Sequence, residues 1–154
     1  MPRIYRLLRT QIVPADIERV WEFFATPRNL NELTPPEMDF TILSGADEPM
    51  YPGQLIEYRI QIVPGIVVSW LTEIVHVEPK RRFIDEQRFG PYQFWYHEHR
   101  FEPTREGTCI EDYVTYALPL GIIGGVVHEL WVRRRLEYIF DFRRQAIERI
   151  FGTI

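Results

Sequence analysis

Residues 94–117 read FWYHEHRFEPTREGTCIEDYVTYA, in which two alternating runs flank the segment Thr104–Gly107. Side chains of a strand alternate between its two faces, so the stretch predicts an antiparallel hairpin that turns at this segment. That register gathers apolar side chains and one His/Asp pair on the inward face. The predicted inward pairs are Phe101–Ile110, His99–Asp112, His97–Val114 and Trp95–Tyr116, and an outward ion pair is Arg100–Glu111.

Upstream of the hairpin, the sequence predicts four more strands. Polar and apolar residues alternate there, and glycine- or proline-containing pairs interrupt the alternation. Between residues 54 and 63, for example, Ile56, Tyr58 and Ile60 share one side, which is typical of an antiparallel sheet with one face in water. The predicted ranges are 39–44, 54–63, 66–78 and 82–89.

The N-terminal part predicts a strand followed by two short helices. The strand covers residues 3–13 and ends at Pro14, which has no backbone N–H to donate. Apolar residues then recur at helical spacing from Asp16 to about Thr26. A second helix, of about residues 28–33, ends before two consecutive prolines, which disfavour helical geometry in the preceding residue.

The C-terminal part predicts one long helix over residues 126–151, with Val127, Leu130 and Phe140 among its apolar positions. The preceding segment 119–125, PLGIIGG, is apolar and rich in glycine, so we expect it to be mobile or to form a lip. A curved sheet of seven antiparallel strands needs cover on its concave side, and only this helix is long enough. We therefore predict an α+β fold that encloses a space between helix and sheet.

Composition limits the class of protein. The 154 residues, 45% of them hydrophobic, suit a single domain spanning residues 1–154. The net charge of −4 comes from interspersed acids and bases, which gives no attraction to nucleic acid. No apolar run is long enough to cross a bilayer, and Cys109 has no cysteine partner for a disulfide. We expect a reduced, cytoplasmic protein without stable membrane insertion, and the oligomeric state stays open.

The two histidines of the hairpin are the main candidates for chemistry. A buried His99–Asp112 pair can simply satisfy its own hydrogen bonds, line a pocket as a polar recognition group, or act in acid/base catalysis. His97 and His99 could also bind a metal with Asp112 as third ligand, but no further histidine is placed with certainty on that face. We therefore predict no metal, and the lack of GxSxG, GxGxxG and Walker motifs predicts no cofactor.

Inward positions of the neighbouring strands extend this candidate site. Asp85 and Gln87 share the side of Phe83, where burial without partners would be costly. They indicate a wet cavity, contacts with His97, or a place at the sheet edge. The aromatic content of 14% favours a pocket. The predicted ligand-binding residues are Trp70, Asp85, Gln87, Trp95, His97, His99, Asp112 and Tyr116.

Four segments carry the clearest part of a resemblance to a known family, and the resemblance covers nearly the whole chain. They are IVPADIERVWEFFATPRNLNELTPP, SWLTEI, RRFIDEQRFGPYQFWYHEHRFEP and GTCIEDYVTYALPLG. The chain resembles the START-like (SRPBCC) superfamily, and within it the bacterial polyketide cyclase/dehydrase and lipid transport-like subgroup. The resemblance implies a helix-grip fold, with the sheet wrapped around the C-terminal helix and a cavity for a hydrophobic ligand, but no particular reaction. It implies a cavity lining of Trp70, Trp95, His97, His99 and Tyr116.

Two hypotheses about function follow. The first is a carrier or sensor that binds a small hydrophobic or amphipathic ligand, such as a lipid, polyketide, isoprenoid or quinone, with segment 119–125 as the entrance. The alternative is a cyclase or dehydratase in which His99, made more basic by Asp112, removes a proton from an activated carbon. A regulatory role through a protein partner ranks third.

Overall fold

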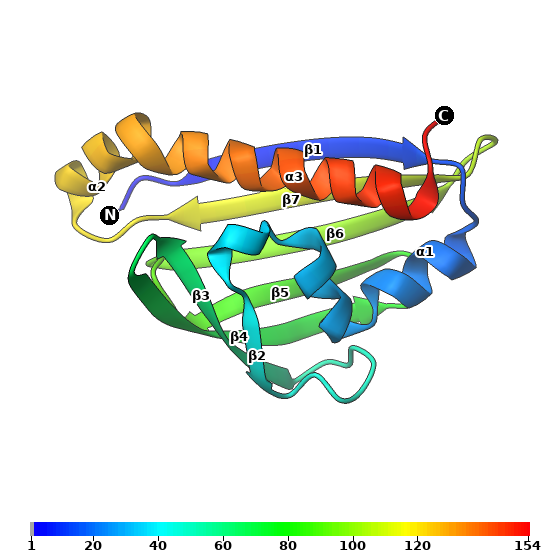
Figure 1. Ribbon diagram of the computed structural model, residues 1–154, viewed down its shortest axis with the longest axis horizontal. Coiled ribbons are helices and arrows are strands. Elements are labelled where there is room, and N and C mark those ends of the chain that lie inside the picture. The colour runs from blue at the N-terminus through cyan, green and yellow to red at the C-terminus, as the bar shows by residue number, and fades with distance from the viewer. Residues whose placement is uncertain (1) are drawn as a thin grey trace.

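The computed structural model describes residues 2–154, and this part of the chain forms one curved sheet whose concave side is covered by helices (Figure 1). The strands are all antiparallel and follow the order β1-β7-β6-β5-β4-β3-β2. Their bounds are β1 Tyr5–Val13, β2 Thr41–Ser44, β3 Gln54–Val63, β4 Ile66–Glu78, β5 Arg82–Phe89, β6 Phe94–Pro103 and β7 Thr108–Ala117.

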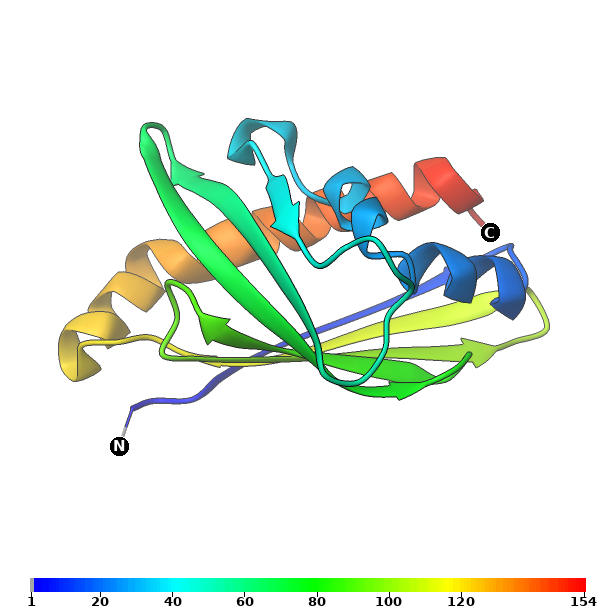
Figure 2. The ribbon, with the colours of Figure 1, turned by 90° about the horizontal axis from the view of Figure 1, so that it is seen from below.

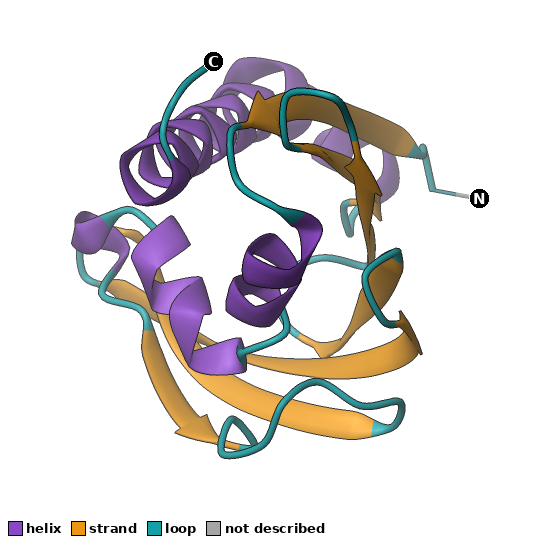
Figure 3. Cartoon of the chain, turned by 90° about the vertical axis from the view of Figure 1, so that its right-hand side faces the viewer, coloured by secondary structure: helices purple, strands orange, loops and turns teal. Residues whose placement is uncertain are grey.

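The helices fall into two groups along the chain. Helix α1 and the short 3-10 helices η1 and η2 connect β1 to β2, and the long C-terminal helix follows β7. A view along this long helix shows the sheet curving around the helices like an open trough (Figure 3). The bounds are α1 Ile17–Phe24, η1 Pro27–Leu33, η2 Pro36–Met38, α2 Gly121–Val127, the π-helical turn η3 His128–Val132, and α3 Arg133–Phe151.

The expected register of the hairpin is confirmed in full: Phe101 lies opposite Ile110, and His99 lies opposite Asp112. Arg100 lies opposite Glu111, but it forms its ion pair with Glu98, at 2.6 Å, instead of the expected one with Glu111. The bounds of β3, β4 and β5 are those predicted, whereas β1 begins at Tyr5 and β2 at Thr41, two residues later than expected. Asp39, which was expected to open a strand, has a positive φ of 46° and so cannot be part of an extended segment.

The segment 119–125, expected to be mobile or to form a lip ahead of the long helix, already contains the start of helix α2 at Gly121. Leu120, at φ 73°, turns the chain, and its carbonyl accepts hydrogen bonds from the backbone N–H groups of Ile123 and Gly124. A Cβ on Gly124 would lie 2.3 Å from the carbonyl oxygen of Pro119, so this tight start requires glycine. The glycines therefore permit close packing at the start of the helix.

The core has two ends, which we call the solid end and the cavity end. The solid end lies beneath α1 and the C-terminal half of α3, and its buried members include Val13, Val20, Phe24, Phe101, Ile110, Ile147 and Phe151. The cavity end lies beneath the N-terminal half of α3, where the β3–β4 hairpin rises away from the other strands (Figure 2). Its buried members include Tyr58, Trp70, Trp95, Tyr116, Leu136 and Phe140.

This arrangement confirms the predicted α+β helix-grip fold, with seven strands and short helices after the first strand within residues 2–154. None of the helices in that range combines the length and the apolar character needed to cross a membrane. Leu130, one of the apolar positions of the predicted helix, is 71% exposed. It belongs to η3, where the π-helical turn shifts the faces of the helix relative to regular α-helical spacing.

Candidate functional site

A cavity of about 410 Å³ lies between the concave face of the sheet and the helices α2, α3 and η1. Its wall is largely apolar, because the inward positions of β3, β4 and β6 carry large rings. Neighbouring rings contact one another: Tyr58 stacks on Trp70 at 5.8 Å, and Trp70 meets Trp95 edge-on at 5.5 Å. The aromatic residues of the wall include Phe40, Tyr58, Trp70, Tyr92, Trp95, Trp131 and Phe140.

The mouth of the cavity is marked by residues that line it and are also exposed. Leu120 is 74% exposed, and Val127 and Trp131 are 44% and 40% exposed. All three lie at or beside α2, at the N-terminal end of the long helix. The segment expected to form the entrance therefore does border the cavity, but as a helical turn.

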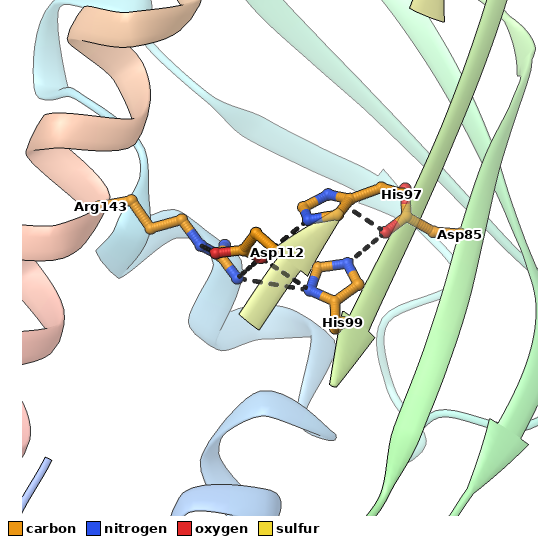
Figure 4. A network of polar contacts seen from close by, with 5 residues as sticks. All are labelled: Asp85, His97, His99, Asp112 and Arg143. Carbon is orange, nitrogen blue, oxygen red and sulfur yellow. Dashed lines mark hydrogen bonds and ion pairs between the residues drawn. The ribbon is translucent and has the colours of Figure 1, made fainter. Parts of the chain in front are cut away.

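Five polar side chains form a cluster at the inner end of the cavity (Figure 4). Asp85 comes from β5, His97 and His99 from β6, Asp112 from β7, and Arg143 from α3. The His97 and His99 rings stack at a centroid distance of 3.6 Å, because they occupy alternate positions on the same face of one strand. Asp85 and Asp112 lie on either side of the histidine pair (Figure 4).

Hydrogen bonds within this polar cluster fix its protonation. Arg143 donates to both carboxylate oxygens of Asp112, over 3.2 Å from Nε and 3.1 Å from Nη2. The same guanidinium lies 3.3 Å from Nδ1 of His99. Because a guanidinium can only donate, Nδ1 accepts, and the proton of His99 is on Nε2, which donates to Asp85 over 2.6 Å. His97 donates from Nε2 to Asp112 over 2.8 Å.

Burial is the largest single influence on the pKa values of His99, Asp85 and Asp112. It lowers the pKa of His99 well below 6.5, and the neighbouring charges of His97 and Arg143 lower it further. Burial also raises the pKa of Asp85. In Asp112, burial alone would raise the pKa, but Arg143 and the hydrogen bond from His97 outweigh it and hold this pKa low. The polar cluster thus combines a neutral His99 with an ionised Asp112.

Two expectations about the histidine pair need correction. Asp112 lies opposite His99 in the register, but its hydrogen bond goes to His97, and its oxygen is 3.6 Å from Nδ1 of His99. Asp112 was also expected to make His99 more basic. The pKa of His99 is instead lowered, because burial outweighs the attraction of the carboxylate. The direct partner of His99 is Asp85, from the neighbouring strand.

The predicted site residues separate into two groups. Trp70, Asp85, Trp95, His97 and His99 line the cavity, and three others do not. The side chain of Gln87 makes two hydrogen bonds with the backbone of Tyr92 and so holds that ring in the wall. The Tyr116 hydroxyl hydrogen bonds to His128, and Asp112 lies behind the histidines. These three residues, Gln87, Asp112 and Tyr116, therefore support the wall.

Reasoning from the sequence missed Arg143, which is only 6% exposed. A signal was present, because Leu136, Phe140, Arg143 and Ile147 recur at the spacing of one helical face. The indole nitrogen of Trp70 is a second unnoticed feature. Within the described residues this buried N–H has no hydrogen-bond partner, and its ring lines the cavity. The nitrogen itself is covered by protein atoms, so it does not face the cavity in this conformation.

Three of the cavity-lining residues offer ligand atoms to a metal ion. One atom from each of Asp85, His97 and His99 lies within 4.8 Å of the others. The carboxylate that accompanies the two histidines in this group is therefore Asp85 and not Asp112, which the sequence suggested.

Comparisons with known proteins establish the architecture. No model of a protein family matches the chain, and no curated protein matches its sequence. Solved structures do match: protein CV1439 from Chromobacterium violaceum has a TM-score of 0.71 at 17% identity, over 99% of this chain and 100% of that one. TTHA0849 from Thermus thermophilus has a TM-score of 0.64 at 21% identity, over 96% and 95%.

A structure of Ara h 8.0201 has a TM-score of 0.61 at 14% identity, over 94% of this chain and 98% of that chain. Identities at this level show a shared fold and leave function open. The comparisons agree with the order of elements and with the sheet that wraps one long helix. The chain therefore has a helix-grip fold, which it shares with these solved structures.

Proposed function

We propose that this protein binds one small, mainly apolar ligand in the cavity between sheet and C-terminal helix, and acts as a carrier or sensor. The observation that carries the proposal is the cavity itself: about 410 Å³ of space, walled by aromatic side chains and ended by a polar cluster. Ligand pockets range from about 300 to 1,000 Å³ and combine apolar walls with a few polar groups. A lipid, polyketide, isoprenoid or quinone-like molecule suits such a site.

The apolar wall supplies most of the attraction. Burying about 300 Å² of apolar ligand surface is worth about 7 kcal/mol before the costs of association. Those costs are of similar size, so hydrophobic burial alone gives weak binding. A polar contact is therefore needed for useful affinity. The indole N–H of Trp70 has no partner among the described residues but is covered by protein atoms. We infer that this ring turns on binding and donates to an oxygen acceptor, such as a carbonyl, on the ligand.

The protonation of the polar cluster favours binding over acid/base catalysis by His99. A general base needs a free lone pair within reach of the substrate. Nδ1 of His99 accepts from Arg143, and its Nε2 carries a proton that is donated to Asp85. The ring thus has no free lone pair, and its low pKa weakens it as a base. This argues against the cyclase or dehydratase alternative built on His99 and Asp112.

The proposal is tested by identifying and then excluding the ligand. Native mass spectrometry of the purified protein should show a bound small molecule, which extraction and fragmentation identify. The Ile139→Trp variant places a large ring in the cavity wall and should weaken binding of that molecule at least about tenfold. Loss of binding with an unchanged melting temperature would separate a filled cavity from an unfolded protein.

A matched pair of variants tests the polar contact. Trp70→Phe keeps an aromatic ring and removes the N–H, and we expect it to weaken binding about five- to tenfold, since a hydrogen bond is worth about 1 kcal/mol. Trp21→Phe is the same change at the solid end, outside the cavity, and should leave affinity unchanged. Equal affinities of all variants for the isolated ligand would rule out this cavity as the binding site.

A further inference from the structure

We propose that Asp85, His97 and His99 bind a divalent first-row transition-metal ion at the inner end of the cavity. The sequence alone suggested two imidazoles with Asp112, and that set was incomplete because Asp112 faces their other side. The structure brings in Asp85 from β5 as a third group on the cavity side (Figure 4). Two imidazoles and one carboxylate are a donor set that suits zinc, iron(II) or cobalt(II).

The distances between the donor atoms require little movement. Oδ2 of Asp85 lies 2.6 Å from Nε2 of His99 and 3.8 Å from Nδ1 of His97. An ion held at about 2.0–2.2 Å by each ligand separates neighbouring ligand atoms by about 3.0–3.5 Å. One gap must widen and the other narrow, each by less than about 1 Å. Because the two rings stack at 3.6 Å with an angle of 24° between their planes, the His97 ring must also turn out of the stack before both lone pairs point at one ion.

The far sides of both rings are supported as metal-bound histidines usually are. A histidine that binds a metal through one nitrogen commonly donates its other N–H to a carboxylate, which fixes the ring. Oδ1 of Asp112 lies 2.8 Å from Nε2 of His97 and 3.6 Å from Nδ1 of His99. Asp112 thus faces the rear nitrogens of both rings, while Asp85 faces the front nitrogens.

Arg143 makes its ion pair with Asp112, on the far side of the two rings, so the guanidinium does not occupy the place between Asp85 and the histidines. The hydrogen bond from Nε2 of His99 to Asp85 is the competing arrangement of the same groups, and it is the alternative that the experiment must separate.

Arg143 is the group that opposes a metal ion, because its Nη2 lies 3.3 Å from Nδ1 of His99. When Nε2 of His99 binds the ion, its proton must move to Nδ1, which then faces Oδ1 of Asp112 instead of accepting from Arg143. Arg143 keeps both of its hydrogen bonds to Asp112 in that state. The cost is one hydrogen bond between Arg143 and His99, replaced by one to a carboxylate.

Because all three ligands line the cavity, the coordination positions left by the protein face the space that we propose for the ligand. An oxygen atom of that ligand could complete the coordination sphere. This last point rests on the proposed function, whereas occupation of the site by a metal ion does not.

The test uses tag-free protein, stripped with a chelator and titrated with Co²⁺ alone. We expect a visible ligand-field absorption band that saturates at one ion per chain, and displacement of Co²⁺ by Zn²⁺. Asp85→Asn and His99→Gln should each weaken Co²⁺ binding at least about tenfold, in keeping with the loss of one ligand. His76→Gln, on the half-exposed end of β4, is the matched control and should bind as the unmodified protein does.

Thermal melts of each variant guard against misfolding, and Asp112→Asn adds a variant that keeps all three ligands. It should weaken binding about 10- to 100-fold, because it loosens both rings. If the unmodified protein gives no absorption band with millimolar Co²⁺, or if the Asp85 and His99 variants bind it equally well, the proposal is overturned and the hydrogen bond between His99 and Asp85 is all that joins these groups. Displacement of the fluorescent probe 1-anilinonaphthalene-8-sulfonate from the same samples reports on the apolar cavity separately, so failure of one proposal leaves the other testable.

Discussion

The solid end and the cavity end of the core contain similar side chains but pack them differently. At the solid end, aromatic rings from the helices contact rings from the strands: Phe24 lies 5.1 Å from Phe101, and Trp21 lies 5.6 Å from Phe101. At the cavity end, the closest ring pairs join neighbouring strands and loops, as Tyr92 and Trp95 do at 4.8 Å. An aromatic sequence therefore does not by itself predict a hollow, because the helices above decide whether the space is filled.

The polar cluster lies where the two ends meet. His99 stacks on Phe83 of the solid end at 4.0 Å, and His97 lies 5.8 Å from Phe140 of the cavity wall. The guanidinium of Arg143 lies over the rings of both Phe24 and Phe140. The cluster thus links α3 to three strands at the boundary between the packed core and the cavity. Its groups pack against rings of the solid end, and all but Asp112 line the cavity.

The largest expected effect comes from breaking this junction with Arg143→Met. The change removes the guanidinium and leaves the buried carboxylate of Asp112 without its counter-charge, which costs about 3–5 kcal/mol. Urea unfolding monitored by tryptophan fluorescence measures the loss. Adding Asp112→Asn should recover part of it, because the amide needs no counter-charge. A loss below about 1 kcal/mol for Arg143→Met would contradict a buried ion pair at this position.

The next effect compares the two ends directly on one helix. Ile147 and Leu136 are both buried on α3, but Ile147 packs in the solid end and Leu136 lines the cavity. Ile147→Ala should cost about 4 kcal/mol, and Leu136→Ala about 2 kcal/mol, because a residue beside a void has fewer contacts to lose. Chemical denaturation of the two variants gives the difference. Equal losses would mean that the cavity collapses or is filled in solution.

The sequence predicted the fold almost completely, because patterns within short segments specify the strands and their pairing. Alternation in residues 54–63 and the hairpin turn at Thr104–Gly107 determine the strands and the register. Patterns of this kind persist wherever one face of a strand is buried and the other is in water. The start of α2 escaped prediction because the glycines of PLGIIGG weaken the helical signal, while their close packing against Pro119 is a contact that only the folded chain reveals.

The candidate site was predicted less well, since partners within it come from separate elements. The position of His97 and His99 on the inward face followed from the hairpin alone. Which carboxylate each ring contacts depends on how the side chains rotate. Asp112, expected as the partner of His99, binds His97 instead, and His99 binds Asp85. Arg143 approaches from a helix that is distant in sequence, so no local pattern connects it to Asp112. Tyr116 was expected in the wall but points to His128.

His128 provides a second buried imidazole, and its surroundings contrast with those of the polar cluster. It is 1% exposed, stacks on Tyr5 at 3.5 Å, and its Nε2 lies 2.7 Å from the hydroxyl of Tyr116. Burial raises the pKa of Tyr116 to about 12, so this hydroxyl keeps its proton and donates it. Unlike His97, this ring has no buried carboxylate as a partner among residues 2–154. The charged groups that influence its pKa are Arg3, Glu129 and Arg133.

The smallest expected effect is a dependence of stability on pH that comes from His128. Burial lowers the pKa of this imidazole in the folded protein, while the unfolded chain keeps the ordinary value of 6.5. As pH falls below about 6.5, the unfolded chain takes up a proton that the folded protein excludes, so stability decreases by at most about 1.4 kcal/mol per pH unit. His128→Asn retains an acceptor for Tyr116 and should make this decrease shallower between about pH 6.5 and 5. Both proteins keep the contribution of His99, which has the same sign, and that of Asp85, whose raised pKa gives the opposite sign. Urea unfolding across that range measures both slopes, and identical slopes would show that His128 gains its proton equally well in the folded protein.

Above about pH 7.5 the imidazole is neutral in both the folded and the unfolded state. The free energies of unfolding of the two proteins should therefore differ there by an amount that does not depend on pH.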